Sequence, residues 1–141
     1  MRRSIHPKLF VVAIALTVWA CGDAATTTTP TTPTATTPTT TETFEGDLNP
    51  NGAKTFPFIT QAAGTVTATL TSLSPDSTLT IGMSLGTWNG TACQIVLAND
   101  NAIQGAVITG TVSSTGSLCV RVYDVGKLVE PVAFVVTVVH P

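Results

Sequence analysis

Oxygen-bearing side chains gather at two points of the sequence, and calcium binding is the chemistry that they would support. Three polar residues stand together at 99–101, and Asp124 ends the candidate strand at 117–124. Carboxylate and amide oxygens are the ligands that calcium takes in proteins. The candidate donors are Asn99, Asp100, Asn101 and Asp124, with Asp47 or Glu45 as further ones. The alternative is that these residues only form turns, for which Asn and Asp are well suited, and their spacing does not match an EF-hand loop.

Two aromatic residues are candidates for ligand binding. Trp88 stands beside the turn signal Asn89-Gly90, and Tyr123 is expected on the outward face of a strand. Aromatic rings with a polar edge are suited to contact sugars at a protein surface. A tryptophan next to a turn also packs over the rim of a β-sandwich core, so both interpretations of Trp88 stay open.

The sequence offers few candidate catalytic residues. A nucleophile needs a positioned base, and the chain contains two histidines, His6 and His140. His6 lies in an N-terminal segment that we expect to be removed, and His140 is the penultimate residue, where chain ends fray. The sequence holds no H-E-x-x-H motif, no P-loop and no glycine-rich dinucleotide fingerprint. We therefore expect no enzyme, with a hydrolase that uses His140, or a carboxylate pair, as the remaining alternatives.

The N-terminus has the pattern of an export signal. Arg2, Arg3 and Lys8 precede an apolar run of twelve residues at 9–20. This is shorter than the about 20 residues that span a bilayer, and it has the length of a signal-peptide core. Without this segment the chain has three basic against eight acidic side chains, a formal charge of −5. No basic patch remains, so we expect no nucleic acid as a partner.

The signal ends in Val18-Trp19-Ala20-Cys21, which resembles the lipobox of bacterial lipoproteins, although Trp19 is bulkier than the usual residue. The resemblance implies cleavage after residue 20 and acylation of Cys21, with palmitate among the chains. Several acyl chains anchor a protein stably in a membrane. Gly22, and not an aspartate, follows the cysteine, which in lipoproteins favours the outer over the inner membrane. The alternative is an ordinary secretory signal cut near Ala20 or Ala25.

Residues 21–43 are predicted to be a disordered tether that begins with the lipidated cysteine. Thirteen of the eighteen residues from Thr26 to Thr43 are threonine and three are proline. The run has no apolar period of 2 or 3.6, so no burial offsets the entropy of ordering it. In a polyproline-II conformation, at about 3.1 Å per residue, it spans up to roughly 60 Å. We interpret it as a spacer between a membrane and a domain, or as an O-glycosylated stalk.

From residue 44 to 141 the pattern changes, and apolar residues alternate with Thr, Ser and Gly at period 2. This is the period of a half-buried strand, and turn signals separate the runs. Strong candidate strands are 65–73, 79–85, 117–124 and 133–139, and weaker ones are 44–48, 54–59, 94–98 and 106–112. About eight short strands predict an all-β fold, an antiparallel β-sandwich of jelly-roll or Ig-like type.

Cys93 and Cys119 are the two cysteines left once Cys21 is acylated, as the lipoprotein resemblance implies. Disulfides persist in exported proteins. We therefore predict a Cys93–Cys119 disulfide between the strands at 94–98 and 117–124. Two reduced, buried thiols are the alternative.

Residues 44–141 also resemble the bacterial pre-peptidase C-terminal domain, a secreted β-sandwich module. The resemblance lies in FEGDLNPNGAKTFPFITQAAGTVTATLTSLSPDSTLTIGM (44–83) and GSLCVRVYDVGKLVEPVAFVVTVVHP (116–141). It implies an accessory or binding module of the kind that is appended to secreted hydrolases. The sequence departs from the family at 77–81, where many members carry an acidic strand, and at Cys119, where an aromatic residue is usual.

These patterns predict a non-catalytic lipoprotein of the cell envelope that presents a β-sandwich for binding or adhesion away from the membrane. The expected partners are the membrane, through the lipid anchor, and a glycan, polymer or envelope protein. The alternatives are a structural or accessory lipoprotein without its own ligand, and a calcium-stabilised accessory domain of a secreted hydrolase system.

Overall fold

The computed structural model describes residues 36–141, so the predicted signal, Cys21 and most of the tether lie outside the described residues. Eight strands make up the described chain, which confirms the all-β prediction. They are β1 (Thr40–Leu48), β2 (Ala53–Thr60), β3 (Gly64–Ser74), β4 (Ile81–Trp88), β5 (Cys93–Ala102), β6 (Val107–Val112), β7 (Gly116–Tyr123) and β8 (Val132–His140). No helix long and apolar enough to cross a membrane occurs within 36–141.

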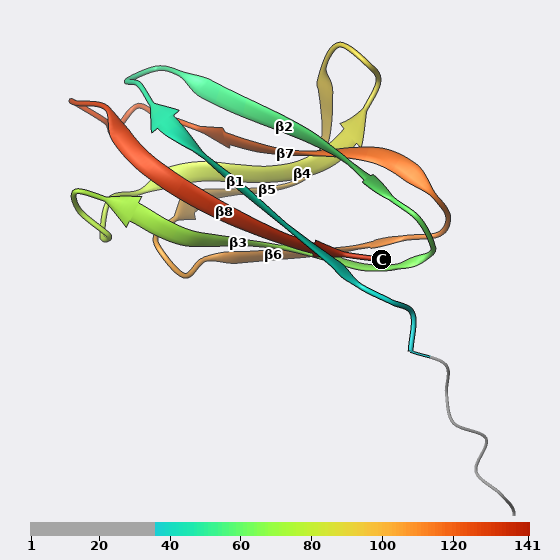
Figure 1. The fold of residues 1–141 in the computed structure, drawn as a ribbon. Helices are drawn as coiled ribbons and strands as arrows, with labels where there is room; N and C mark the ends of the chain where they lie inside the picture. The colour runs from blue at the N-terminus through green and yellow to red at the C-terminus, as the bar shows by residue number, and fades with distance from the viewer. Residues whose placement is uncertain (1–35) are drawn as a thin grey trace, which may run out of the picture. The chain divides into compact units, whose positions relative to one another are not determined.

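The strands form two four-stranded antiparallel sheets stacked face to face (Figure 1). One sheet has the order β1-β8-β3-β6 and the other has the order β2-β7-β4-β5. β1 and β2 are therefore the edge strands on one side of the sandwich, and β5 and β6 are the edge strands on the other. β1 begins and β8 ends at the same end of the sandwich, which we call the N-terminal end.

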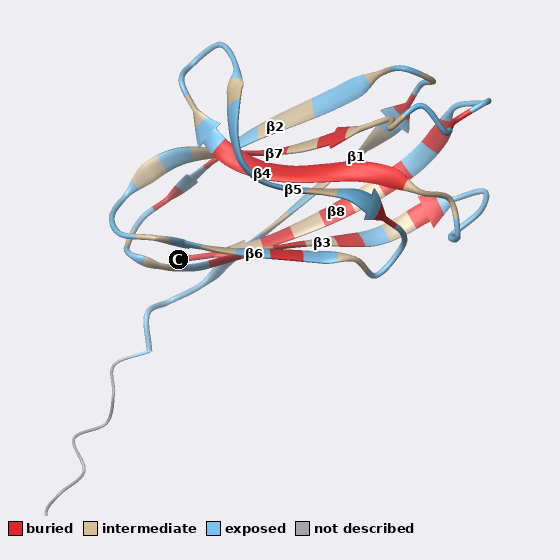
Figure 2. Ribbon diagram, turned by 180° about the vertical axis from the view of Figure 1, so that it is seen from behind, coloured by how far each residue is buried: buried red, intermediate tan, exposed pale blue. Residues whose placement is uncertain are grey.

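The hydrophobic core lies between the sheets and follows from the period-2 alternation. Val66, Ala68 and Leu70 of β3 are at most 2% exposed, whereas the threonines between them point to the outer face. Val136 and Val138 repeat this pattern on the neighbouring strand β8, and Figure 2 shows buried positions alternating with more exposed ones. Burying one Val or Leu side chain contributes about 1.5–3 kcal/mol, so the alternation also fixes the register of the strands.

β4 departs from the alternation because both of its faces are buried between residues 81 and 86. Its inward face carries the buried apolar side chains of Ile81, Met83 and Leu85. On its outward face, Gly82 lies under the ring of Tyr123, and Gly86 lies under the backbone of β5 at Gln94. A Cβ at either position would overlap the atoms above it, so both positions require glycine.

Two predicted boundaries differ from the observed ones. β1 begins at Thr40 and not at Phe44, because residues 40–43 pair with residues 137–140 of β8. Threonine is a good strand former, and pairing at an edge needs no apolar side chain. Residues 99–101, predicted as a turn, lie inside β5, which extends to Ala102 and has an irregular register there.

The C-terminus is not frayed, which corrects the prediction for His140. The side chain is buried, its ring centroid lies 5.1 Å from that of Phe58, and its Nε2 lies 3.0 Å from Glu42 Oε1. The carbonyl oxygen of Pro141 accepts a hydrogen bond of 2.9 Å from the backbone N–H of Gln61. The last strand is therefore held to its end, since β8 pairs with both β1 and β3.

Deletion of His140 and Pro141 should destabilise the domain. The deletion removes a buried ring and the hydrogen bond to Gln61, and the loss of a large buried side chain costs about 2–5 kcal/mol. Urea denaturation of the full and the shortened chain, followed by circular dichroism, measures the difference. A change within about 0.5 kcal/mol, as expected at an exposed position, would contradict this packing.

Candidate functional site

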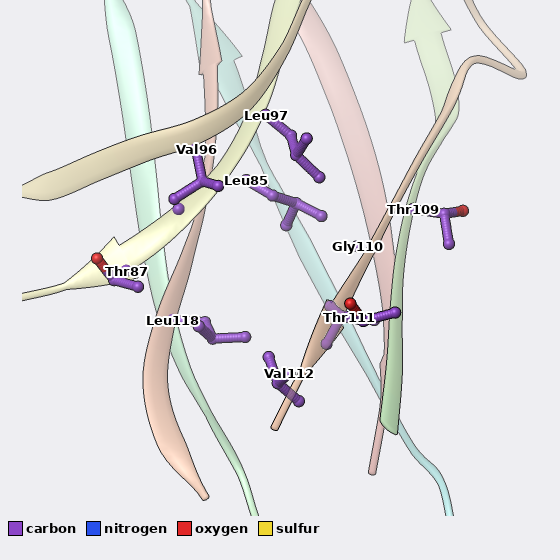
Figure 3. Close-up of a pocket in the computed structure, with 11 residues that line it drawn as sticks. Leu85, Thr87, Val96, Leu97, Thr109, Gly110, Thr111, Val112 and Leu118 are labelled. Carbon is purple, nitrogen blue, oxygen red and sulfur yellow. The ribbon is translucent and has the colours of Figure 1, made fainter. Parts of the chain in front are cut away.

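A groove opens on the side of the sandwich where β5 and β6 are the edge strands. It has a volume of ≈ 510 Å³ and is lined by residues of both sheets (Figure 3). The lining residues are Val66, Leu85, Gly86, Thr87, Val96, Leu97, Thr109, Gly110, Thr111, Val112 and Leu118. All of these described residues are apolar, glycine or threonine, and none is charged. The groove therefore suits apolar groups, and its lining supplies no carboxylate, imidazole or thiol.

Apolar side chains are also exposed on β5 and β6, the two edge strands that form the rim of the groove. The exposed fractions are 47% for Ile95, 69% for Val96 and 52% for Val107. β5 carries an extra residue in its pairing with β4, and this bulge lets the adjacent Val96 and Leu97 both line the groove. On β6, Gly110 leaves the groove open, because a Cβ there would lie 3.1 Å from Leu97 Cδ1.

The β4–β5 hairpin projects from the N-terminal end of the sandwich (Figure 1). Its tip, residues 89–92, is exposed and is closed by its own hydrogen bonds. Asn89 Oδ1 accepts hydrogen bonds from the backbone N–H groups of Thr91, at 2.9 Å, and Ala92, at 2.7 Å. The predicted Cys93–Cys119 disulfide is present and joins the base of the hairpin to β7. The hairpin is thus constrained at both its base and its tip.

Trp88 and Tyr123 are not brought together. Trp88 is half-buried at the end of β4, next to the hairpin. Tyr123 pairs with Gly82, near the opposite end of β4. Six residues of an extended strand separate these two positions, a distance of about 20 Å. The two rings therefore do not form one binding face.

Tyr123 belongs to a polar cluster on the outer face of its sheet. Its hydroxyl donates a hydrogen bond to Asp100 Oδ1, and the guanidinium carbon of Arg121 lies 5.3 Å from its ring centroid. Burial, and then the hydrogen bond and negative charge of Asp100, raise the pKa of Tyr123 to about 12. The ring lies over Gly82, so the cluster covers the outward face of β4.

The candidate calcium donors are engaged in hydrogen bonds within the protein. Asp100 accepts from Tyr123, and Asn99 Oδ1 accepts from the backbone N–H of Asn101 at 3.0 Å. The Asp124 carboxylate accepts from four backbone N–H groups, those of Asn51, Gly126, Lys127 and Leu128. Among residues 36–141, no group of three or more His, Cys, Asp or Glu side chains is placed to hold a metal ion. Calcium binding here stays a prediction.

The groove is the feature that the sequence reasoning missed. The signal for it was the run Ile95-Val96-Leu97, in which three consecutive apolar residues break the period-2 pattern. Such a run fits a bulged edge strand, where two neighbouring side chains can share one face. Gly110 gave no signal of its own, because a glycine between two threonines is compatible with any exposed strand.

No protein-family model and no curated protein matches this chain. Among solved structures it is similar to PliG of Aeromonas hydrophila, a periplasmic lysozyme inhibitor of g-type lysozyme. The TM-score is 0.52 and the identity 14%, and the match covers 70% of this chain and 83% of the PliG chain. At this identity the similarity establishes the β-sandwich fold alone. The resemblance to the pre-peptidase C-terminal domain stays a hypothesis.

Replacement of Asp124 by asparagine should lower stability at neutral pH but not in acid. Partial burial raises the pKa of Asp124, but the four backbone N–H donors outweigh it and hold the pKa below its usual range. Such a carboxylate stabilises the fold above its ordinary pKa, and the effect is lost as the pH falls through the lowered folded-state value. Because Asp124 is only partly buried and solvent screens its charge, we expect a loss of about 1 kcal/mol in urea denaturation at neutral pH. A difference that persists unchanged at acid pH would contradict this role of the charge.

Replacement of both Cys93 and Cys119 by serine should destabilise the domain by ~3.5 kcal/mol, the chain-entropy value for cysteines 26 residues apart. Guanidinium chloride denaturation of the two proteins measures this difference. Limited proteolysis should also cut the variant faster within residues 89–92, because the base of the hairpin is no longer joined to β7. The wild-type chain in reductant is the control. Equal stability and equal cleavage would show that the disulfide does not constrain the hairpin.

Proposed function

We propose that this protein is a non-catalytic binding module of the bacterial cell envelope and that its partner is a protein. The apolar groove between β5 and β6, with its exposed rim, is the observation that carries the proposal. Soluble monomers rarely expose contiguous apolar surface, and where they do it commonly serves binding. A volume of ≈ 510 Å³ is also within the usual size of ligand sites.

A protein partner fits the groove better than a glycan. Sugars need convergent hydrogen-bonding groups and aromatic rings, whereas the described lining has no charged, amide or aromatic side chain. The fold similarity to PliG supports the same class of function, because an inhibitor of a lysozyme must bind another protein. Apolar side chains of a partner are the groups that such a lining accommodates.

The N-terminal sequence gives this module its proposed location. The lipobox-like residues 18–21 favour acylation of Cys21, and Gly22 favours the outer membrane over the inner one. The threonine and proline residues that follow would separate the lipid from the β-sandwich by up to roughly 60 Å. The protein would thus be anchored to the envelope and would present its groove away from the membrane.

Two other functions are the alternatives. An adhesion module for a glycan or polymer would use Trp88, which lies beside the projecting hairpin. A structural or accessory lipoprotein, including a calcium-stabilised domain of a secreted hydrolase system, would leave the groove without an occupant.

Photo-crosslinking in the producing cells tests the proposal. A photoreactive amino acid in place of Val96, on the rim of the groove, should give discrete adducts with one or a few proteins. The matched control is the same replacement at Val129, which is 92% exposed and does not line the groove. Adducts at position 96 and none at position 129 are expected. Purified g-type lysozyme is the first protein to test for direct binding, in view of the fold similarity.

Two results would contradict a protein partner. Binding to a glycan array that is lost in Trp88→Ala, without protein adducts at position 96, would indicate a glycan-binding module. The absence of both adducts and glycan binding would favour the structural or accessory alternative.

A further inference from the structure

Three of the four sheet edges carry features that discourage another strand from pairing with them. Native proteins protect edges with charges, proline or bulges. β1 carries three acidic residues between positions 42 and 47, and β2 carries Lys54 and Pro57. β5 has two register irregularities and carries Asp100. These three edges are therefore poor templates for strand addition.

β6 lacks each of these protective features. Its sequence from Val107 to Val112 contains no charged residue and no proline. Its register with β3 is regular over the whole strand, from Val107 paired with Thr69 to Val112 paired with Gly64. No other described strand pairs with its second edge. An edge of this kind is a ready template for an added strand.

The backbone groups that face the free edge of β6 can be assigned from one hydrogen bond. The backbone N–H of Leu70 donates to the carbonyl oxygen of Ala106 at 2.9 Å, so the C=O of Ala106 faces β3. In an antiparallel pair the polar backbone groups alternate in direction along the strand. Those at positions 108, 110 and 112 therefore face β3 as well. The N–H and C=O groups of Thr109 and Thr111 face the free edge.

The groove lies directly beside this edge, because Thr109, Gly110, Thr111 and Val112 line it. We infer that the free edge of β6 and the adjacent groove receive an extended, uncharged segment of a partner protein, added as a fifth strand to the sheet of β1, β8, β3 and β6. The backbone of this segment pairs with Thr109 and Thr111. Every second side chain of it is apolar and enters the groove. This inference rests on the proposed function, since it specifies how the partner protein is bound.

A segment of another protein fits the edge better than a second copy of this chain does. Two β6 strands joined edge to edge would meet over about 20 Å of strand and one sheet thickness of about 10 Å. The contact would bury roughly 200 Å² per partner, well below the about 800 Å² per partner of a stable interface. In addition, Ile108 of β6 is already buried in its own core and cannot fill the groove of a second copy. Because the lining of the groove is uncharged, we expect the segment that binds there to be uncharged as well.

A synthetic peptide tests the edge without knowledge of the natural partner. The probe is Lys-Lys-Val-Thr-Val-Thr-Val-Thr-Lys-Lys with a fluorophore at its N-terminus, and the control peptide has proline in place of the central valine. Fluorescence anisotropy with the full chain should show binding of the probe and not of the control. Hydrogen exchange should show that the amides of Thr109 and Thr111 become protected when the probe binds.

Two variants at one position separate the edge from the surrounding surface. Thr109→Pro removes the N–H that faces the free edge and leaves the hydrogen bonds between β6 and β3 in place, as proline does on an edge strand. Thr109→Val keeps the N–H and the shape of the side chain. We expect roughly tenfold weaker binding of the probe by T109P, the order expected for one lost backbone hydrogen bond, and unchanged binding by T109V. Gly110→Leu, which fills the groove, should also abolish binding.

Several results would overturn the inference. The first is that the probe does not bind at millimolar concentration, and the second is that T109P and T109V bind it equally well. The third is that sedimentation shows a stable dimer of the chain, which T109P abolishes. A failure of the proposed function gives a different result, because no protein adduct then forms in the photo-crosslinking experiment at position 96. If adducts form there and persist in T109P, the binding module stands and strand addition on β6 is wrong.

Discussion

The apolar layer between the two sheets is the constraint on which the rest of the structure depends. Each strand places every second side chain into this layer, where it must meet one from the opposite sheet. On the side of β1 and β2, aromatic rings fill the layer, and Phe44 stacks on Phe56 with ring centroids 5.1 Å apart. Phe58 and Phe134 complete this cluster, which holds every phenylalanine of residues 36–141. The opposite side receives smaller side chains and a glycine, so the groove is the part of the layer that the chain's own residues leave unfilled.

Small residues also determine how closely neighbouring groups pack on the outward face of β4. Gly82 and Gly86 admit the Tyr123 ring and the β5 backbone, and Ser84 between them is completely buried. The Ser84 hydroxyl has no hydrogen-bond partner among the described residues, which costs about 1–3 kcal/mol. Small residues on β4 thus allow neighbouring strands to close over it. The disulfide at Cys119 adds a covalent constraint near the end of β4, where the hairpin leaves the sheet.

Alternation in the sequence was sufficient to predict the eight strands and the fold class, because burial on one face imposes a period of 2. It was not sufficient where a second element covers a strand. Residues 81–86 are buried on both faces, and His140 is buried near the chain end, because of contacts with residues distant in sequence. Residues 40–43 belong to β1, although their composition matches that of the preceding residues, which are rich in threonine and proline. The groove depends on a bulge at Val96 and on the glycine at position 110, which lie on two different sheets. No local sequence pattern indicates that these two positions face each other.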